Sequence, residues 1–255
     1  NHSSEGTGYK TLDDKHYRLL TDDENNQYTV RENGVVYNEN NQATDYRVVV
    51  EGSQEKAYKD LGDLYQGDTL LGNVFLQARN PISKAAPLKA KVTSYLWLTT
   101  SDDEGKTWSN PVDITAQVKA DWMRFLGTGP GVGIQLKDGS LVMPIYYTNS
   151  NNKQSSAVII SKDGGKTWVR GESPNDRRLE SSGGSRLLNS DAYQLTEAQL
   201  IELDNGELKM FSRNLSGSVN ISTSKDGGFT WQKEVVADGI LLDPYSQMSV
   251  IKYSK

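Results

Sequence analysis

The chain has 255 residues and a mass of 28.3 kDa, which is enough for one large or two smaller domains with a buried core. Its 28 Lys and Arg against 33 Asp and Glu give a net charge of -5 and a pI near 5.2, which argues against nucleic acid as a partner. The lack of cysteine excludes disulfides and thiolate zinc sites, and the two histidines are too few for a histidine-based metal site. The sequence contains no run of about 18 apolar residues, the length that a membrane-spanning helix needs.

Residues 1–93 are predicted to form a separate β-rich unit. The stretch YTVRENGVVYN (28–38) places two β-rich arms around Asn33-Gly34, a dipeptide typical of hairpin turns. A second stretch (65–77) places Gly67-Asp68 between a polar and an apolar run, which favours another turn. We therefore expect short antiparallel strands in this part of the chain.

Residues 94–255 contain one eight-residue phrase, Ser-x-Asp-x-Gly-x-Thr-Trp, three times. The copies are SDDEGKTW at 101–108, SKDGGKTW at 161–168 and SKDGGFTW at 224–231. Their starts lie 60 and 63 residues apart, and each copy follows a short apolar run of the kind that forms a strand. A nearly fixed period indicates a radial or solenoid architecture, and the chain as a whole is predicted to be all-β.

Each copy, here called a box, has the residue types of a tight hairpin turn. The Asp can accept hydrogen bonds from backbone N–H groups of its own turn, and the Gly can adopt a positive φ. The Trp after the turn has a large apolar side chain that can pack against a sheet. We therefore expect the boxes at hairpin turns on an outer rim, with Trp108, Trp168 and Trp231 packed between sheets.

The segments around the boxes carry further local signals. Mixed apolar spacing near 114–124 favours a short helix. The stretch GTGPGVG (127–133) does not match G-x-G-x-x-G and indicates close backbone packing rather than a nucleotide loop. Further along the chain we expect a strand at 141–148, a hairpin over 199–213 with Asn205-Gly206 at its tip, and a last strand at 246–254.

Glu197 and Arg213 stand out because they lie eight residues to either side of Asn205, the predicted hairpin tip. On paired strands their side chains would face the same end of a sheet. A cross-strand ion pair, worth about 0.2–1 kcal/mol if exposed, would explain them. A role in ligand binding would also explain them. In a β-propeller, which is one radial architecture, ligands bind where the inner strands end. The spacing leaves both interpretations open.

Beyond the boxes, seven phrases resemble the catalytic domain of large bacterial exo-α-sialidases (neuraminidases), whose repeats are called Asp boxes. The phrases are WMRFLGTGPGVGIQL (122–136), MPIYYTN (143–149), KQSSAVI (153–159), GESPNDRR (171–178), QLTEAQ (194–199), FSRNLSG (211–217) and DPYSQMSVI (243–251). The resemblance covers essentially the whole chain. It implies part of a six-bladed β-propeller over 94–255, with 1–93 as a small β-rich domain inserted into it.

The resemblance assigns roles to six residues through their match to the family's motifs. Glu197 matches the buried glutamate that takes the proton from a nucleophilic tyrosine, which would make it catalytic. Arg213 matches the second of three arginines that hold the sialic acid carboxylate. Tyr245 matches a tyrosine of the sugar pocket. The last three match residues around the N-acetyl and glycerol arms, although each could belong to the core or the rim: Phe125, Tyr147 and Gln154.

The resemblance also implies that part of the site lies outside this chain. In the family, the first arginine and an aspartate acid/base precede the inserted domain, while the third arginine and the nucleophilic tyrosine follow the region matched here. The chain begins at Asn1 without an initiator Met and ends within a predicted strand. We therefore expect an internal piece of roughly three blades that is inactive alone, with the remaining segments of the parent protein as its partners.

The implied activity is the release of terminal sialic acid from glycoconjugates by a secreted or cell-surface bacterial enzyme. Two alternatives remain open, an intramolecular trans-sialidase and a carbohydrate-binding propeller without catalysis. We expect sialylated glycans as partners, no nucleic acid and no cofactor. We also expect no metal site, because no D-x-D-x-D-G calcium loop occurs in the sequence.

Overall fold

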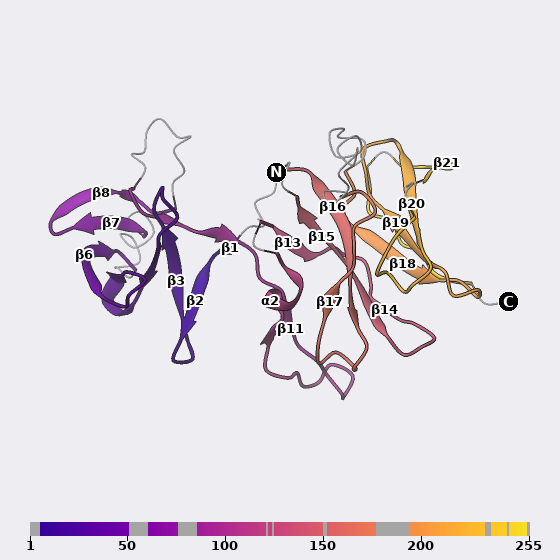
Figure 1. Ribbon diagram of the computed structural model, residues 1–255, viewed down its shortest axis with the longest axis horizontal. Coiled ribbons are helices and arrows are strands. Elements are labelled where there is room, and N and C mark those ends of the chain that lie inside the picture. The colour runs from indigo at the N-terminus through magenta and orange to yellow at the C-terminus, as the bar shows by residue number, and fades with distance from the viewer. Residues whose placement is uncertain are drawn as a thin grey trace. The chain divides into compact units, whose positions relative to one another are not determined.

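The computed structural model forms two compact units, residues 1–94 and residues 95–255, and both are built almost wholly from antiparallel strands (Figure 1). The residues that the structure describes are 6–50, 61–75, 86–120, 122–123, 125–149, 152–176, 194–232, 236–243 and 245–253. Each unit has its own hydrophobic core, so each is described by itself.

The first unit is an eight-stranded antiparallel sheet. Seven of its strands pair in chain order: β2 (Tyr9–Leu12), β3 (Lys15–Thr21), β4 (Gln27–Val30), β5 (Val35–Tyr37), β6 (Ala43–Val48), β7 (Asp63–Gln66) and β8 (Thr69–Asn73). The eighth, β9 (Lys89–Ala90), pairs with β3. A two-stranded pair, β1 (Gly6–Thr7) with β10 (Val92–Thr93), completes the unit. Leu20, Val36, Val48 and Leu64 form the centre of its core, each almost fully buried.

Both predicted turns of this unit are confirmed. Gly67-Asp68 joins β7 to β8. The stretch 28–38 is a hairpin of β4 and β5, but its loop contains a 3-10 turn, η1 (Glu32–Gly34), that the sequence reading did not foresee. Gly34 is required there, because it has φ +77° and a Cβ would lie 1.9 Å from the Val48 carbonyl oxygen.

The described residues of the second unit form three successive antiparallel sheets. The first pairs β11 (Trp97–Leu98) with β12 (Val112–Asp113) and precedes a short helix, α2 (Thr115–Val118), within the predicted helical stretch. The second contains β13 (Leu126–Thr128), β14 (Ile134–Gln135), β15 (Leu141–Thr148), β16 (Gln154–Ser161) and β17 (Val169–Arg170). The third contains β18 (Ala198–Glu202), β19 (Leu208–Ser212), β20 (Ser218–Ser224) and β21 (Val236–Leu242). The strand predicted at 141–148 and the hairpin over 199–213 are confirmed.

Strand β15 separates two cores, because successive side chains of a strand point to opposite faces. On one face Ile145 and Tyr147 join a cluster with Ile159 and Trp168. On the other face, Val142 joins residues of β16 and of the third sheet in a second cluster, whose buried members also include Val158, Ile160, Ala198, Leu200, Leu208 and Met210. The second and third sheets therefore pack face to face.

In all three boxes the Ser, Asp, Gly and Thr close the same hydrogen-bonded turn, as predicted. The Trp indole donates back to the turn in the first two boxes, whereas the buried Nε1 of Trp231 has no partner among the described residues. In the second box, Asp163 accepts hydrogen bonds from the Thr167 backbone N–H at 2.9 Å and from the Thr167 hydroxyl at 2.6 Å. Ser161 Oγ donates to Asp163 and accepts from the Gly165 N–H, each at 2.8 Å. The indole of Trp168 then donates to the Gly165 carbonyl at 3.0 Å. The turn thus satisfies its own polar groups.

The burial predicted for the box tryptophans differs among the copies. Trp168 is 3% exposed, and Trp231 is half-buried against the core between the second and third sheets. Trp108 is 62% exposed, so its predicted packing between sheets is wrong. The difference arises from the surroundings: the residues of α2 contact Trp168, where Gln117 accepts from its backbone N–H at 2.7 Å. No described segment covers Trp108 in the same way.

The strand predicted at 246–254 is also wrong over the part that the structure describes. Residues 245–253 make no ladder with any described strand, and residue 254 lies outside the described residues. Ile251 and Tyr253, the side chains that a strand would bury, are 82% and 84% exposed. An apolar alternation becomes a strand only where a neighbouring strand pairs with it.

Candidate functional site

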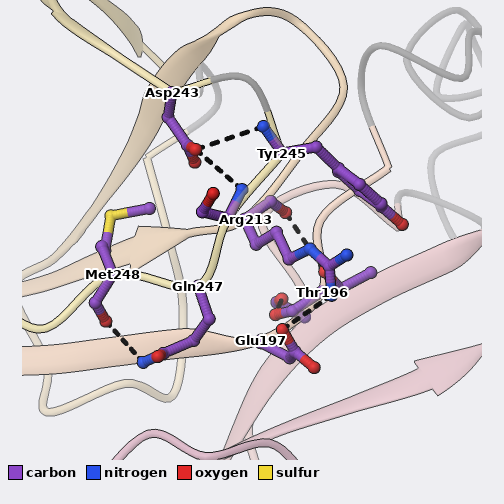
Figure 2. Close-up of polar contacts among 9 residues, drawn as sticks. Thr196, Glu197, Arg213, Asp243, Tyr245, Gln247 and Met248 are labelled. Carbon is purple, nitrogen blue, oxygen red and sulfur yellow. Dashed lines mark hydrogen bonds and ion pairs between the residues drawn. The ribbon is translucent and has the colours of Figure 1, made fainter.

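Glu197 and Arg213 lie opposite each other just beyond β18 and β19, at the end of the sheet away from the hairpin tip. The ladder continues one step further, since the Arg213 N–H donates to the Glu197 carbonyl at 2.9 Å and the Thr196 N–H to the Arg213 carbonyl at 3.0 Å. The two side chains therefore share one face, and Arg213 Nη1 donates to Glu197 Oε2 at 2.8 Å (Figure 2). About a quarter of each side chain is exposed, so the pair is accessible.

The Arg213 guanidinium is held from a second side by Tyr245. The Tyr245 ring lies against its flat face, with 3.7 Å between the guanidinium carbon and the ring centre. Arg213 Nε is buried and has no hydrogen-bond partner among the described residues. A guanidinium has five N–H donors, and the described residues accept from Nη1 alone, so this partly exposed group retains donors for a planar anion.

The surface of β15 and β16 that faces the third sheet changes from apolar to polar along its length. It runs from Val142 and Ile160 to the cross-strand pairs Tyr146 with Ser156 and Thr148 with Gln154. The polar part contacts the segment that carries Glu197, because the Ser156 hydroxyl donates to the Thr196 carbonyl. The apolar core therefore ends where the Glu197–Arg213 pair begins.

Tyr146 belongs to this polar part and was not singled out from the sequence. Burial raises the pKa of its phenol, and the charge of Glu197 raises it further while Arg213 opposes the rise. Phe125 packs against Tyr146, with ring centres 5.0 Å apart. The signal that could have found Tyr146 is the alternation along β15, which places it opposite Ser156 and next to the Glu197 segment.

The glycine-rich stretch 127–133 packs directly against the backbone at Glu197 and Ala198. A Cβ on Gly129 would lie 3.1 Å from three atoms of Glu197, and one on Gly131 would lie 1.8 Å from the Ala198 carbonyl oxygen. Gln199 bonds both ways to Val132, accepting from its N–H at 3.1 Å and donating to its carbonyl at 3.3 Å. The predicted close backbone packing is confirmed, and it fixes the start of β18, directly after Glu197.

The six residues predicted for the site do not all come together. Glu197, Arg213 and Tyr245 form one contact group, and Phe125 joins it through Tyr146. Gln154 lies on the same face of the β15–β16 sheet, where its Nε2 donates to Thr148 Oγ1 at 3.2 Å and its buried Oε1 has no partner among the described residues.

Tyr147 is kept apart from this group. It points to the opposite face of β15, is 2% exposed, and donates its hydroxyl to Asp176 at 3.0 Å. Burial and the charge of Asp176 raise the pKa of the Tyr147 phenol well above its usual range. The physical reason is register: one position along a strand moves a side chain to the other face. Tyr146, not Tyr147, lies beside Glu197 and Arg213.

Three further observations concern the described residues only. They contain no group of three or more His, Asp or Glu side chains placed to hold a metal ion. None of their helices has the length and hydropathy needed to cross a membrane. The box carboxylates accept their hydrogen bonds from within their own turns.

Comparisons with known proteins agree on one family. Residues 73–252 match the BNR repeat-like domain family. An anhydrosialidase from Macrobdella decora is 32% identical over 280 residues, which cover 99% of this chain and 33% of that protein. A sialidase from Bacteroides fragilis is 38% identical over 140 residues, covering 54% of this chain and 23% of that protein.

A solved structure supports the same fold. The intramolecular trans-sialidase from Ruminococcus gnavus, in complex with oseltamivir carboxylate, has a TM-score of 0.53 and 27% identity, covering 97% of this chain and 51% of that one. The chain spans a third or less of the two relatives named above. The fold of 95–255 is therefore part of a sialidase-type β-propeller, and the chain belongs to the BNR repeat-like domain family as a sialidase-like domain.

Proposed function

We propose that the protein containing this chain removes terminal sialic acid from glycoconjugates, and that Glu197 and Arg213 are this chain's share of the site. The observation that supports the proposal is the state of Arg213. Its guanidinium is oriented by Glu197 and Tyr245, is a quarter exposed, and has a buried Nε without a partner among the described residues. A guanidinium that is oriented on two sides, partly exposed and incompletely paired can still receive an anionic ligand.

Arg213 is suited to hold the carboxylate of a sialic acid. That carboxylate is planar, and a guanidinium can meet it with two parallel N–H groups, whereas an ammonium presents only a point charge. The stacked Tyr245 ring limits the guanidinium to in-plane approach. We assign Arg213 to substrate binding, with Tyr245 as its support and as one wall of the sugar pocket.

Glu197 is suited to act as a base toward a tyrosine nucleophile that another part of the protein would supply. The anomeric carbon of sialic acid itself carries a carboxylate, so a neutral tyrosine approaches it with less repulsion than a second carboxylate would. Sialidases are an exception to the two-carboxylate rule of glycosidases for this reason. The carboxylate of Glu197 is oriented by Arg213, which leaves its second oxygen free of any donor from the described residues.

Intramolecular transfer is a second candidate for the product. It is favoured by the names of two relatives that match nearly the whole chain, the anhydrosialidase from Macrobdella decora and the intramolecular trans-sialidase from Ruminococcus gnavus. The two outcomes differ in the acceptor of the sialyl group, which is water in hydrolysis and a hydroxyl of the same sugar in transfer. NMR of the products from a sialylated oligosaccharide distinguishes free sialic acid from an anhydro sugar.

The test of the proposal measures release of a fluorogenic sialoside by the 255-residue chain alone and by the protein that contains it. We expect turnover by the containing protein only, because losing even one acid, base or oxyanion donor commonly costs ~10²–10⁴-fold in rate. Binding of a sialoside without turnover by the containing protein would favour the carbohydrate-binding alternative. Turnover by the chain alone would mean that catalytic groups lie within it.

We further propose that the protein acts outside the cell, secreted or at the surface, because sialylated glycoconjugates are found there. Fractionation of the source organism tests this, with antibodies against the 255-residue chain. Recovery in the cytosol alone would contradict it.

A further inference from the structure

Tyr245 has a backbone conformation that a residue with a Cβ rarely adopts. Its φ is +113°, which lies in the region normally left to glycine, and it is the only residue between 200 and 253 other than glycine with a positive φ among those described. A strained backbone persists only where surrounding contacts over-determine it. The ring of this same residue stacks on Arg213 at 3.7 Å. The strain therefore occurs at the residue that supports the arginine.

Asp243 supplies the contacts that hold this conformation. It directly follows β21 and is 7% exposed. Its Oδ1 accepts a hydrogen bond from the Tyr245 N–H at 3.2 Å (Figure 2) and another from the Ser246 N–H at 2.7 Å. Its own N–H donates to the Gly217 carbonyl at 3.0 Å, in the turn that leads into β20. The carboxylate is thus anchored to the sheet and fixes two consecutive amides.

The second oxygen of the same carboxylate shows that this arrangement has a cost. Asp243 Oδ2 is buried and has no hydrogen-bond partner among the described residues. Burying an unpaired carboxylate oxygen opposes folding. A turn that served only to end a strand could use a serine or asparagine at lower cost. The buried carboxylate of Asp243 is therefore better explained by a role in placing Tyr245 than by a role in ending the strand.

We infer that Asp243 is a positioning residue of the candidate site. It holds the Tyr245 backbone at positive φ, so that the Tyr245 ring stays on the Arg213 guanidinium and keeps that group in plane for a carboxylate ligand. The contact between Asp243 and Tyr245 is independent of any ligand, but its value for sialic acid binding rests on the proposed function. Within the described part of the chain, Asp243 forms no hydrogen bond with Glu197 or Arg213.

The first experiment needs no ligand. A tyrosine ring at 3.7 Å shifts the NMR signals of the Arg213 side-chain protons upfield. Asp243→Ala removes both accepted hydrogen bonds and should abolish this shift. Asp243→Asn keeps a carbonyl oxygen at the Oδ1 position and should retain it. The matched control is Asp138→Ala, because Asp138 Oδ1 caps the Ser140 N–H at 2.9 Å in an exposed turn of the same unit, and this variant should leave the shift unchanged.

The second experiment measures affinity for N-acetylneuraminic acid in the protein that contains the chain. Loss of the stacked ring should weaken binding by about 2- to 30-fold in Asp243→Ala. Asp138→Ala should bind as the wild type does. Asp243→Ala and Tyr245→Ala should not add in the double variant, because the first acts through the second.

The possible outcomes separate the two proposals. If the Arg213 shift persists in Asp243→Ala, the positioning role is overturned whatever the protein binds. If the shift is lost and wild-type protein does not bind the sugar, Asp243 still positions Tyr245, but the proposed function fails. Should Asp243→Ala unfold, Asp243→Asn decides the matter: a lost shift in that folded variant contradicts the role assigned to the Oδ1 acceptor, and a retained shift supports it.

Discussion

The sheet of β18, β19 and β20 carries charged side chains at both of its ends. The two ends differ in how far the hydrogen bonds of these side chains are satisfied within the protein. At one end, Asp226 of the third box accepts from Ser224 Oγ at 2.7 Å and from the Thr230 N–H at 2.9 Å, all within one turn. At the other end, Arg213 pairs with Glu197 across the sheet and keeps a buried Nε without a described partner. Both ends belong to the same short strands.

This difference separates a structural charge from a functional one. The carboxylate of Asp226 in the third box forms its hydrogen bonds within its own turn. Burial raises the pKa of Asp226, but the hydroxyl and N–H of Thr230 and the Ser224 hydroxyl lower this pKa below its usual value. This carboxylate accepts three hydrogen bonds within its turn, which leaves about one of its roughly four acceptor sites for a ligand. At the other end, the half-buried side chains of Glu197 and Arg213 keep hydrogen-bonding groups that have no protein partner among the described residues. A ligand could pair with these groups. Mutations at the two ends should therefore change different properties.

The largest effect is expected for Glu197→Gln in the protein that contains this chain. Glutamine keeps the shape and can still accept from Arg213, but it is not a base. We expect kcat to fall by ~10²–10⁴-fold while KM and the melting temperature change little. Steady-state kinetics and a thermal melt on the same preparation measure both.

The control for this prediction is Glu202→Gln, on the same strand at the box end, where the carboxylate accepts from the Lys137 N–H at 3.0 Å. It should leave kcat unchanged. Unchanged turnover in Glu197→Gln, together with a lower melting temperature, would return the pair to the purely structural interpretation.

At the box end the expected effect is on stability. Trp168 is 3% exposed and Trp108 is 62% exposed, although both boxes close the same turn. Trp168→Ala should lower the free energy of unfolding by about 3–5 kcal/mol. Trp108→Ala should change it by no more than about 0.5 kcal/mol. Urea denaturation of the 255-residue chain measures both, and equal losses would mean that Trp108 is buried in solution.

The turns were predictable from sequence because their chemistry is local. Asp163, Gly165 and Thr167 satisfy one another within a few residues, so the phrase that encodes the turn can be recognised without knowledge of the rest of the fold. The Asn33-Gly34 hairpin is predictable for the same reason. The pairing of Glu197 with Arg213 followed from counting residues on either side of one hairpin tip.

The features that were missed depend on contacts between distant segments. Tyr146 and Tyr147 are adjacent, and only the register of β15 shows which one faces Glu197. Trp108 ends the same motif as Trp168, but it is at Trp168 that α2 supplies a contact, through the Gln117 side chain. Asp243 was not singled out from the sequence, and its importance became visible only with the positive φ of Tyr245. None of these can be read from a short window.

A smaller kinetic effect is expected for Arg213→Lys. Lysine keeps the charge but loses the planar fork and its stacking on Tyr245. We expect kcat/KM to fall by ~10–150-fold, through loss of one charged hydrogen bond. The matched control is Arg31→Lys, in the other unit, where the guanidinium also stacks on a tyrosine, Tyr37, at 4.1 Å. A silent Arg213→Lys would contradict the assigned role in carboxylate binding.

The smallest effect is expected for the charge of a box carboxylate, and it should depend on pH. The hydroxyl and N–H of Thr167 and the Ser161 hydroxyl lower the pKa of Asp163 from 3.8 to about 2. A carboxyl whose pKa is lower in the folded state stabilises the fold above its unfolded value and loses that contribution as pH falls toward the folded value.

Asp163→Asn should therefore be slightly less stable than the wild type at pH 7, and the difference should shrink as pH falls from about 4 to about 2. Thermal melts of both proteins across this range measure it. The activity of the containing protein should be unaffected at pH 7, because every recorded contact of this carboxylate lies within its own turn. A stability difference that stayed constant down to pH 2 would show that the charge of Asp163 contributes nothing, and that the turn depends on shape alone.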